Sequence, residues 1–164
     1  YDENYIYNLP FKTSQKFKVS QGYNGTYSHQ NENSLDFPMP IGTELTAIRE
    51  GTVIKVIENN NKNCVEKECD KYNNFIIIYH PDGTFAQYIH LKQNGSKVKP
   101  GEKVLKGQVI GYSGNVGRSA GPHLHLVVFK QKLKERKTLK TKFKTGNGDK
   151  IEYLIEKNEY SRNY

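Results

Sequence analysis

Two of the chain's five histidines stand two residues apart in an apolar stretch, GPHLHLVV at residues 121–128. If this stretch is a strand, His123 and His125 project side by side from one face, with Cα atoms roughly 6–7 Å apart. Both imidazoles could then reach one cleft, where one binds a metal ion and the other contacts what the ion holds. Taken alone, however, the pattern is more often a pair of buried, hydrogen-bonded histidines.

Other parts of the chain supply the residue types that would complete a metal site. His29 is followed seven residues later by Asp36, and His90 lies in the strand-like segment FAQYIHL. Imidazole and carboxylate groups are typical ligands of catalytic zinc, which uses three protein ligands and keeps a fourth position open for water. Glu32 lies between His29 and Asp36 and is a rival carboxylate. His80 opens the turn HPDGT and is expected to be structural or on the surface.

The elements that must position these side chains are predicted to be strands. β-Branched and aromatic residues dominate six segments that are bounded by Gly, Pro and Asn turns. The six segments are residues 16–20, 51–58, 75–80, 85–91, 108–113 and 123–129. One short helix is expected within residues 131–138, and a terminal hairpin of residues 138–145 and 150–156 is expected to join the main sheet. The sequence therefore predicts one all-β domain, mostly antiparallel, with little helix.

The 164-residue chain carries a net charge of +8, which favours polyanionic partners. Eight of its 25 Lys and Arg residues fall in residues 130–144, a segment whose ordinary interpretation is a solvated face. The sequence shows no nucleic-acid-binding motif. It also shows no apolar run approaching the roughly 20 residues of a membrane span.

The two cysteines, Cys64 and Cys69, lie in a polar segment between two predicted strands. A disulfide between them would close a small loop and would suit an exported protein. Two free thiols in a cytosolic loop are the alternative. A zinc site on this pair would need two further ligands, and none lies nearby in the sequence.

Three blocks of the sequence together resemble the zinc-dependent M23 peptidases of the LytM/lysostaphin type. They are SHQNENSLDFPMPIGTELTAIREGTV at residues 28–53, YIHL at residues 88–91, and the Gly-rich VKPGEKVLKGQVIGYSGNVGRSAGPHLHLVV at residues 98–128. The resemblance runs from about residue 21 to residue 129 and follows the family's order of motifs. It implies a LytM-like β-sandwich core at residues 16–130, an N-terminal extension at residues 1–15 and a basic C-terminal extension at residues 131–164.

The resemblance also implies that His29, Asp36 and His125 bind one Zn²⁺ per chain. The compact family pattern separates the first His and Asp by four residues, whereas the separation here is seven. Asp36 is nevertheless preferred to Glu32, because DFPMPIGT, which begins with Asp36, keeps the family's register.

By the same resemblance, His90 and His123 are the catalytic histidines beside the water that the metal binds. Tyr23 lies six residues before His29, where some members carry a tyrosine that stabilises the transition state. Tyr27 competes for that role.

The family's activity is hydrolysis of peptide bonds in the stems or cross-bridges of bacterial peptidoglycan, as by a DD-endopeptidase or a related enzyme. Such a substrate implies an exported protein, located in the periplasm, the cell envelope or the extracellular space. A non-catalytic relative that binds the wall or regulates another hydrolase is the alternative, although such a relative would be expected to lose ligands. Residues 98–111 also resemble a biotinyl or lipoyl carrier turn, but the only methionine, Met39, has no lysine beside it.

Overall fold

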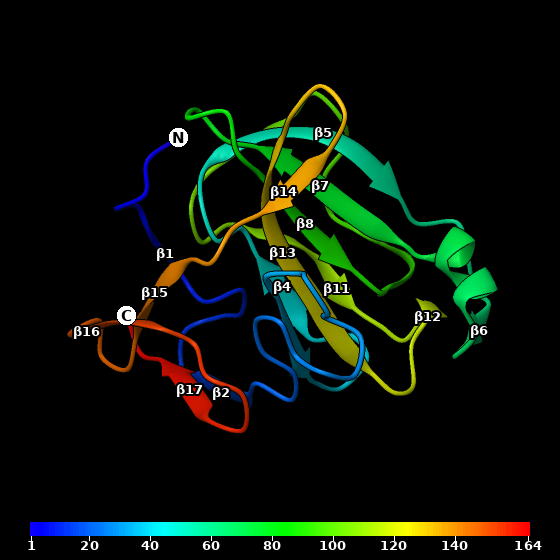
Figure 1. Ribbon diagram of the computed structural model, residues 1–164, viewed down its shortest axis with the longest axis horizontal. Coiled ribbons are helices and arrows are strands. Elements are labelled where there is room, and N and C mark those ends of the chain that lie inside the picture. Colours follow the sequence, from blue (N-terminus) through cyan, green and yellow to red (C-terminus); the bar gives the residue numbers. More distant parts are fainter.

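The protein is built almost entirely of short strands. A computed structural model describes all 164 residues, and Figure 1 shows that both chain ends lie on the same side of the molecule. The helix η1 (Lys67–Tyr72) is a short 3₁₀ turn, and no helix of the structure is suited to crossing a membrane. The strands are β1 (Ile6–Tyr7), β2 (Gln15–Lys18), β3 (Ser34–Pro38), β4 (Glu44–Thr46), β5 (Gly51–Ile57), β6 (Asn63–Cys64), β7 (Phe75–Tyr79), β8 (Phe85–Ile89), β9 (Leu91–Ser96), β10 (Lys103–Val104), β11 (Val109–Ser113), β12 (Gly117–Arg118), β13 (His123–Gln131), β14 (Arg136–Thr138), β15 (Lys142–Thr145), β16 (Lys150–Tyr153) and β17 (Glu159–Arg162).

The largest sheet has seven strands and includes β13, which carries the two neighbouring histidines. Six strands follow the order β10-β5-β7-β8-β13-β14, and β3 also pairs with β13. On one edge of β13, β3 pairs with residues 123–127 and β14 with residues 129–131, whereas β8 pairs along residues 125–129. All of these pairs are antiparallel, and a smaller sheet has the order β4-β11-β9. The prediction of a mostly antiparallel all-β fold is confirmed.

Alternation along β13 separates the core from the face that carries the histidines. Leu124, Leu126 and Val128 are at most 2% exposed and belong to the core cluster of 26 buried residues. His123 and His125 occupy the intervening positions and point to the other face. Burial of each leucine or valine contributes about 1.5–3 kcal/mol, and a one-residue slip would exchange the two faces. The core therefore fixes the direction in which the histidines point.

Residues 1–15, expected to be an extension, contribute to the core. Tyr7, Leu9 and Phe11 are at most 3% exposed. β1 pairs in parallel with β15, and Phe11 forms a bridge with Leu45. The N-terminal segment is therefore packed into the domain.

The terminal hairpin forms, with Lys142 of β15 opposite Tyr153 of β16. It does not join the main sheet as expected, because β15 pairs on its other edge with β1 to give a separate sheet of order β1-β15-β16. The partner strand comes from the opposite end of the chain, a pairing that local sequence patterns do not reveal. The last strand, β17, pairs with β2.

The prediction of a short helix within residues 131–138 was wrong. β13 continues to Gln131, the chain turns, and β14 returns with Lys137 opposite Lys130. Lys, Leu and Glu favour a helix locally, but pairing with the edge of β13 overrides this weak preference. Leu133 is the only apolar side chain of residues 131–138, so a helix here would have had no apolar face to pack on the domain, and Leu133 is fully exposed at the turn.

Candidate metal centre

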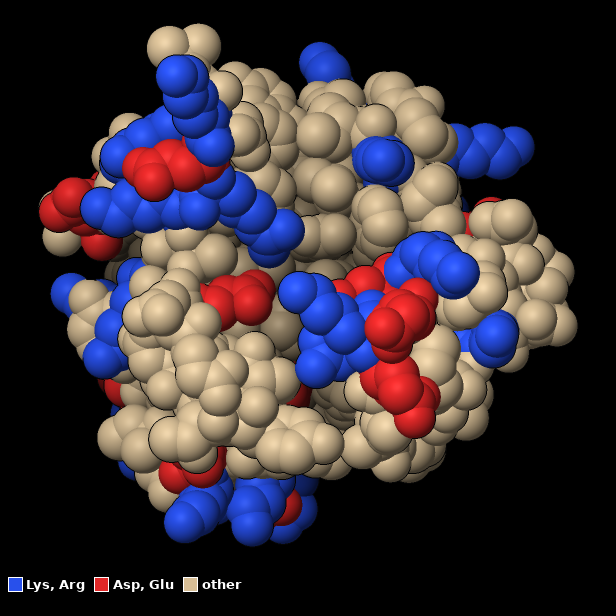
Figure 2. All heavy atoms as spheres, turned by 45° about the vertical axis from the view of Figure 1, so that its right-hand side comes forward, with Lys and Arg blue, Asp and Glu red and all other residues tan.

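A cleft of about 800 Å³ opens beside the histidine face of β13. Its lining is mostly polar and includes Asp36, His90, His123 and His125, whereas His29 lies fully buried behind it. Figure 2 shows a group of basic side chains gathered around one acidic group at the upper left of this face, and acidic and basic side chains mixed elsewhere on it. The net charge of the chain therefore does not by itself identify a partner.

Strand pairing brings Asp36 against His125. The two residues are opposite each other in the register of β3 and β13, a relationship that places Cβ atoms about 4.5–5.5 Å apart on one face. Oδ1 of Asp36 lies 2.9 Å from Nδ1 of His125, and Nε2 of Gln21 donates to Oδ2 of Asp36 at 3.0 Å. Glu32, the rival carboxylate, lies outside this pairing and contacts Nε2 of His125 at 3.6 Å.

His29 presents an unpaired nitrogen to the same carboxylate. Its Nδ1 lies 3.0 Å from the carbonyl oxygen of Gly22, which can only accept, so the proton is assigned to Nδ1 and Nε2 keeps a lone pair. Nε2 is buried without a hydrogen-bond partner, 3.2 Å from Oδ2 of Asp36. A lone pair facing a carboxylate is unfavourable unless a cation is bound between them, so this arrangement suits a metal ligand.

The donor atoms of His29, Asp36 and His125 all lie within 4.8 Å of one another. Two imidazole nitrogens and one carboxylate oxygen form a donor set typical of catalytic zinc, so the residues fit that ion. Cys64 and Cys69 also lie near a carboxylate, but the structure joins their sulfurs in a disulfide, which removes them as thiolate ligands.

The charges at this point favour a bound cation. Burial opposes the charged form of Asp36, but its hydrogen bond with His125 outweighs burial and holds the pKa well below its ordinary value. Burial also opposes charge on His125, yet its hydrogen bond with Asp36 and its ionic contact with Glu32 raise its pKa to about 9. The contact with His125 lowers the pKa of Glu32. In the metal-free chain a proton on His125 supplies the positive charge, and a metal ion would displace it.

His90 and His123 are held by oxygen acceptors on one short segment. Nδ1 of His90 lies 2.9 Å from the carbonyl oxygen of Val116. Nδ1 of His123 lies 2.8 Å from the carbonyl oxygen of Gly121 and 3.0 Å from the hydroxyl of Ser119. Each ring therefore carries its proton on Nδ1 and keeps a lone pair on Nε2.

These two rings lie beside the three candidate ligands. The ring centroids of His90 and His123 are 4.6 Å apart, and Nε2 of His123 is 3.8 Å from Oδ1 of Asp36. Burial, with the nearby His123 and His125, lowers the pKa of His90 to about 3, so His90 is neutral at pH 7. The site thus combines the candidate metal ligands with two rings that can exchange protons.

Tyr23 does not line the cleft. Its hydroxyl donates to the carbonyl oxygen of Thr141 at 2.9 Å, and its ring packs against the core. Tyr27, the competing tyrosine, lines the cleft and is 79% exposed. His80 also lies outside the cleft, where it is buried against Thr84. Sequence spacing alone did not distinguish the two tyrosines, because the chain turns several times between residues 22 and 29.

Sequence reasoning did not find the residues that orient the site. Gln21 binds Asp36 and Ser119 binds His123, but neither residue is a usual metal ligand or proton carrier. The other orienting groups are backbone carbonyls, which leave no trace in residue type. Only the position of Ser119 in the Gly-rich block that precedes H-x-H could have suggested its role.

Comparison with known proteins places these residues in a family context. The sequence matches Peptidase family M23 over residues 29–138. It is 33% identical over 121 residues to the peptidoglycan DD-endopeptidase ShyA of Vibrio cholerae, covering 70% of this chain and 25% of that protein. It is 35% identical over 114 residues to the glycyl-glycine endopeptidase ALE-1 of Staphylococcus capitis, covering 66% of this chain and 28% of that protein.

The fold agrees with this match. The catalytic domain of lysostaphin from Staphylococcus simulans superposes with a TM-score of 0.55 at 28% identity, covering 76% of this chain and 86% of that domain. The chain spans only 25% and 28% of the length of ShyA and ALE-1, respectively. Because the family match covers more than half of the sequence, the chain belongs to peptidase family M23.

Proposed function

We propose that this chain is a zinc-dependent peptidase that hydrolyses peptide bonds in the stems or cross-bridges of bacterial peptidoglycan. The observation that carries the proposal is the grouping of His29, Asp36 and His125 beside His90 and His123 at one open cleft. The family match supports a peptidase, and similarity to the peptidoglycan DD-endopeptidase ShyA supports peptidoglycan as the substrate.

In this proposal Nε2 of His29, a carboxylate oxygen of Asp36 and Nδ1 of His125 hold the metal. When bound there, Zn²⁺ supplies a water of lowered pKa and polarises the carbonyl of the peptide bond. Gln21 keeps the carboxylate of Asp36 in place, and the carbonyl of Gly22 keeps Nε2 of His29 aimed at it.

His90 and His123 handle the protons. Each presents an Nε2 lone pair, because a backbone carbonyl accepts from Nδ1. A neutral imidazole can take the proton of the attacking water and pass it to the departing amine. A protonated ring can then donate a hydrogen bond to the oxyanion. The two rings share this work in the proposal.

An exported location follows from the same proposal. Peptidoglycan lies outside the cytoplasmic membrane, so its hydrolase must reach the periplasm, the cell envelope or the extracellular space. The disulfide between Cys64 and Cys69 supports this location, since disulfides persist in oxidising compartments and are rare in the cytosol.

The test is digestion of purified sacculi, followed by mass analysis of the released fragments. We expect the zinc-loaded wild type to release peptide fragments whose masses identify the bond, and His123→Ala to release at least about 100-fold less. Equal release by both proteins would exclude the proposed mechanism. Binding of the wild type to sacculi without any release would instead identify a non-catalytic relative that binds the wall.

A further inference from the structure

One wall of the cleft contains an arginine whose backbone is fixed from two sides. Arg118 lies on β12, between Val116, whose carbonyl accepts from His90, and Ser119, whose hydroxyl contacts His123. Residues 116–121, the short segment that orients both candidate catalytic histidines, therefore also present a guanidinium group to the cleft.

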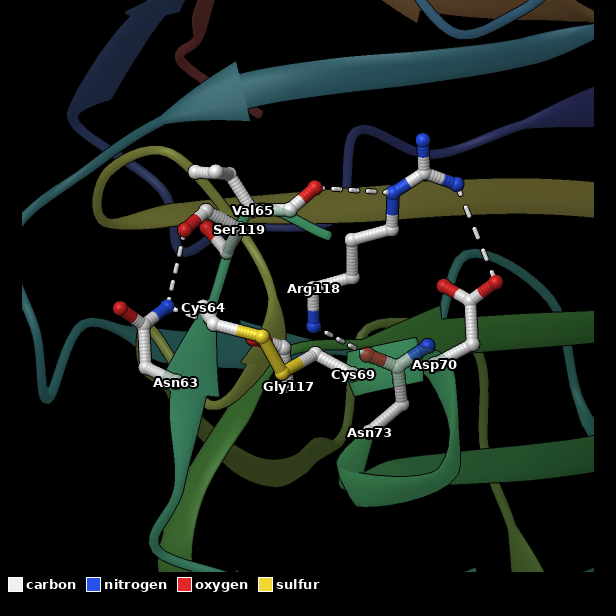
Figure 3. The surroundings of a disulfide bond; sticks show 9 residues. All are labelled: Asn63, Cys64, Val65, Cys69, Asp70, Asn73, Gly117, Arg118 and Ser119. Atoms are coloured by element: carbon white, nitrogen blue, oxygen red, sulfur yellow. Dashed lines mark hydrogen bonds and ion pairs between the residues drawn. A yellow bond between two sulfur atoms is a disulfide. The ribbon is translucent and has the colours of Figure 1, made fainter. Parts of the chain in front are cut away.

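The disulfide lobe, which we define as residues 63–73, holds this segment in place (Figure 3). β6 of the lobe pairs in parallel with β12, and the carbonyl of Cys64 accepts from the N–H of Ser119 at 3.0 Å. Oδ1 of Asn73 accepts from the N–H of Arg118 at 3.0 Å. Gly117 has φ +90°, and a Cβ at this residue would lie only 2.0 Å from Oδ1 of Asn73. This close packing leaves the backbone of Arg118 little freedom.

Protein contacts orient the guanidinium of Arg118 but leave part of its hydrogen-bonding capacity free. Nε of Arg118 donates to the carbonyl of Val65 at 3.3 Å, and Nη1 lies 3.8 Å from Oδ2 of Asp70. Nη2 has no protein partner, and Figure 3 shows it pointing away from both of these contacts. The side chains of Arg118 and Asp70 are 42% and 50% exposed, so this long ion pair is weak and does not neutralise the arginine.

The other arginine of the cleft is already engaged. Nη1 of Arg136 donates to Oε1 of Gln87 at 2.9 Å, and the guanidinium stacks over the ring of Phe129 at 4.0 Å. Its charge also interacts with Glu32. Arg118 is therefore the cationic side chain of the cleft with capacity for a ligand, and Arg136 provides a matched control.

We propose that Arg118 forms a subsite for a carboxylate of the substrate peptide, within a few residues of the bond that is cut. This inference rests on the proposed peptidase function. Peptidoglycan stems carry free side-chain and terminal carboxylates, and guanidinium groups bind carboxylates through directed, charge-assisted hydrogen bonds. Because Arg118 belongs to the segment that holds His90 and His123, such a contact would determine which peptides are cut.

The experiment compares synthetic cross-linked stem peptides that carry every carboxylate with peptides in which the side-chain or the terminal carboxylate is an amide. For the wild type we expect one of the two amides to lower kcat/KM by about 10- to 100-fold, mainly through KM, as for loss of a charged hydrogen bond. The amide that has this effect shows which substrate carboxylate, side-chain or terminal, binds Arg118. Arg118→Gln should cut the free acid and the amide at equal rates, and Arg118→Lys should restore part of the preference.

Two controls distinguish this role from a structural one. Arg136→Gln and Asp70→Asn should keep the preference for the free acid. If Arg118→Gln lowers kcat/KM by the same factor for the free acid and the amide, the preference does not depend on Arg118 and the proposal is wrong. If Asp70→Asn removes the preference as fully as Arg118→Gln does, Arg118 only stabilises the disulfide lobe, and the proposal is again wrong. Wild-type turnover that ignores both amides also overturns it.

A binding measurement keeps the inference separate from the proposed function. Zinc-loaded His123→Ala should bind the free acid more tightly than the decisive amide in titration calorimetry, and His123→Ala/Arg118→Gln should bind both equally. Absence of turnover in the wild type would contradict the peptidase function, whereas equal binding of acid and amide by His123→Ala would contradict the carboxylate subsite alone. Zinc content and thermal unfolding confirm that each variant is folded.

Discussion

Asp36 and His125 stand opposite each other on β3 and β13, with Oδ1 and Nδ1 2.9 Å apart. Sheet register thus joins two side chains that are separated by 89 positions in the sequence. The register depends on core residues of the opposite face, so the metal-binding group and the hydrophobic core are specified by the same pairing.

Replacing Asp36 should affect metal binding far more than replacing Glu32. Asp36→Asn is expected to lower zinc affinity by more than about 100-fold, because it removes a proposed ligand, whereas Glu32→Gln should cost at most about tenfold. Competition with a chelator of known affinity measures both. A larger loss for Glu32→Gln than for Asp36→Asn would show that the ligand assignment is reversed.

Ser119 is expected to position His123 without contacting substrate. Ser119→Ala should lower kcat by about tenfold with KM and zinc content little changed, because the ring loses one of two oxygen contacts that fix its orientation. Ser119→Thr keeps a hydroxyl and should recover most of the rate. Unchanged kcat in Ser119→Ala would show that the carbonyl of Gly121 alone is sufficient.

The cysteine pair gives a prediction about the wall of the cleft. Thiol titration of the denatured chain should detect no thiols before reduction and two after it. Cys64→Ser/Cys69→Ser should lose about 2 kcal/mol of unfolding free energy, the amount expected for closing so short a loop. It should also lower turnover, because the disulfide lobe supports the segment that carries Ser119. Two titratable thiols without reductant, in protein prepared under oxidising conditions, would contradict the pairing.

Acid should destabilise the metal-free protein partly through His80. Burial lowers the pKa of His80 to about 4, so between pH 6.5 and 4 the unfolded chain binds a proton that the folded chain does not. The contribution of neutral His80 to the free energy of unfolding is therefore present in full above pH 6.5. About 2–3 kcal/mol of it is lost as the pH falls toward 4.

His80→Asn removes the titration and can keep the contact with Thr84. Urea unfolding in the presence of a chelator should show a smaller loss of stability between pH 7 and 4.5 for the variant than for the wild type. Equal losses would mean that other groups cause the acid sensitivity.

The sequence allowed prediction of the strands and of the residues that gather at the site, but not of the contacts that orient them. β-Branched and aromatic runs correctly placed the strand with His123 and His125, because their pattern reflects burial against the core. Spacing could not distinguish Tyr23 from Tyr27, since loop turns decide which ring reaches the cleft. The parallel pairing of β1 with β15 could not be predicted either, because it joins segments that lie far apart in the sequence. The Lys-rich stretch after β13 locally favours a helix but forms β14 instead, because it pairs with the edge of β13.

Anomalous diffraction at the zinc edge from crystals of the zinc-loaded protein tests the central claim most directly. The account predicts one strong peak per chain, about 2.0–2.2 Å from Nε2 of His29, a carboxylate oxygen of Asp36 and Nδ1 of His125. A peak held by Glu32 in place of Asp36, or no peak at these three residues in protein loaded with zinc, would contradict it.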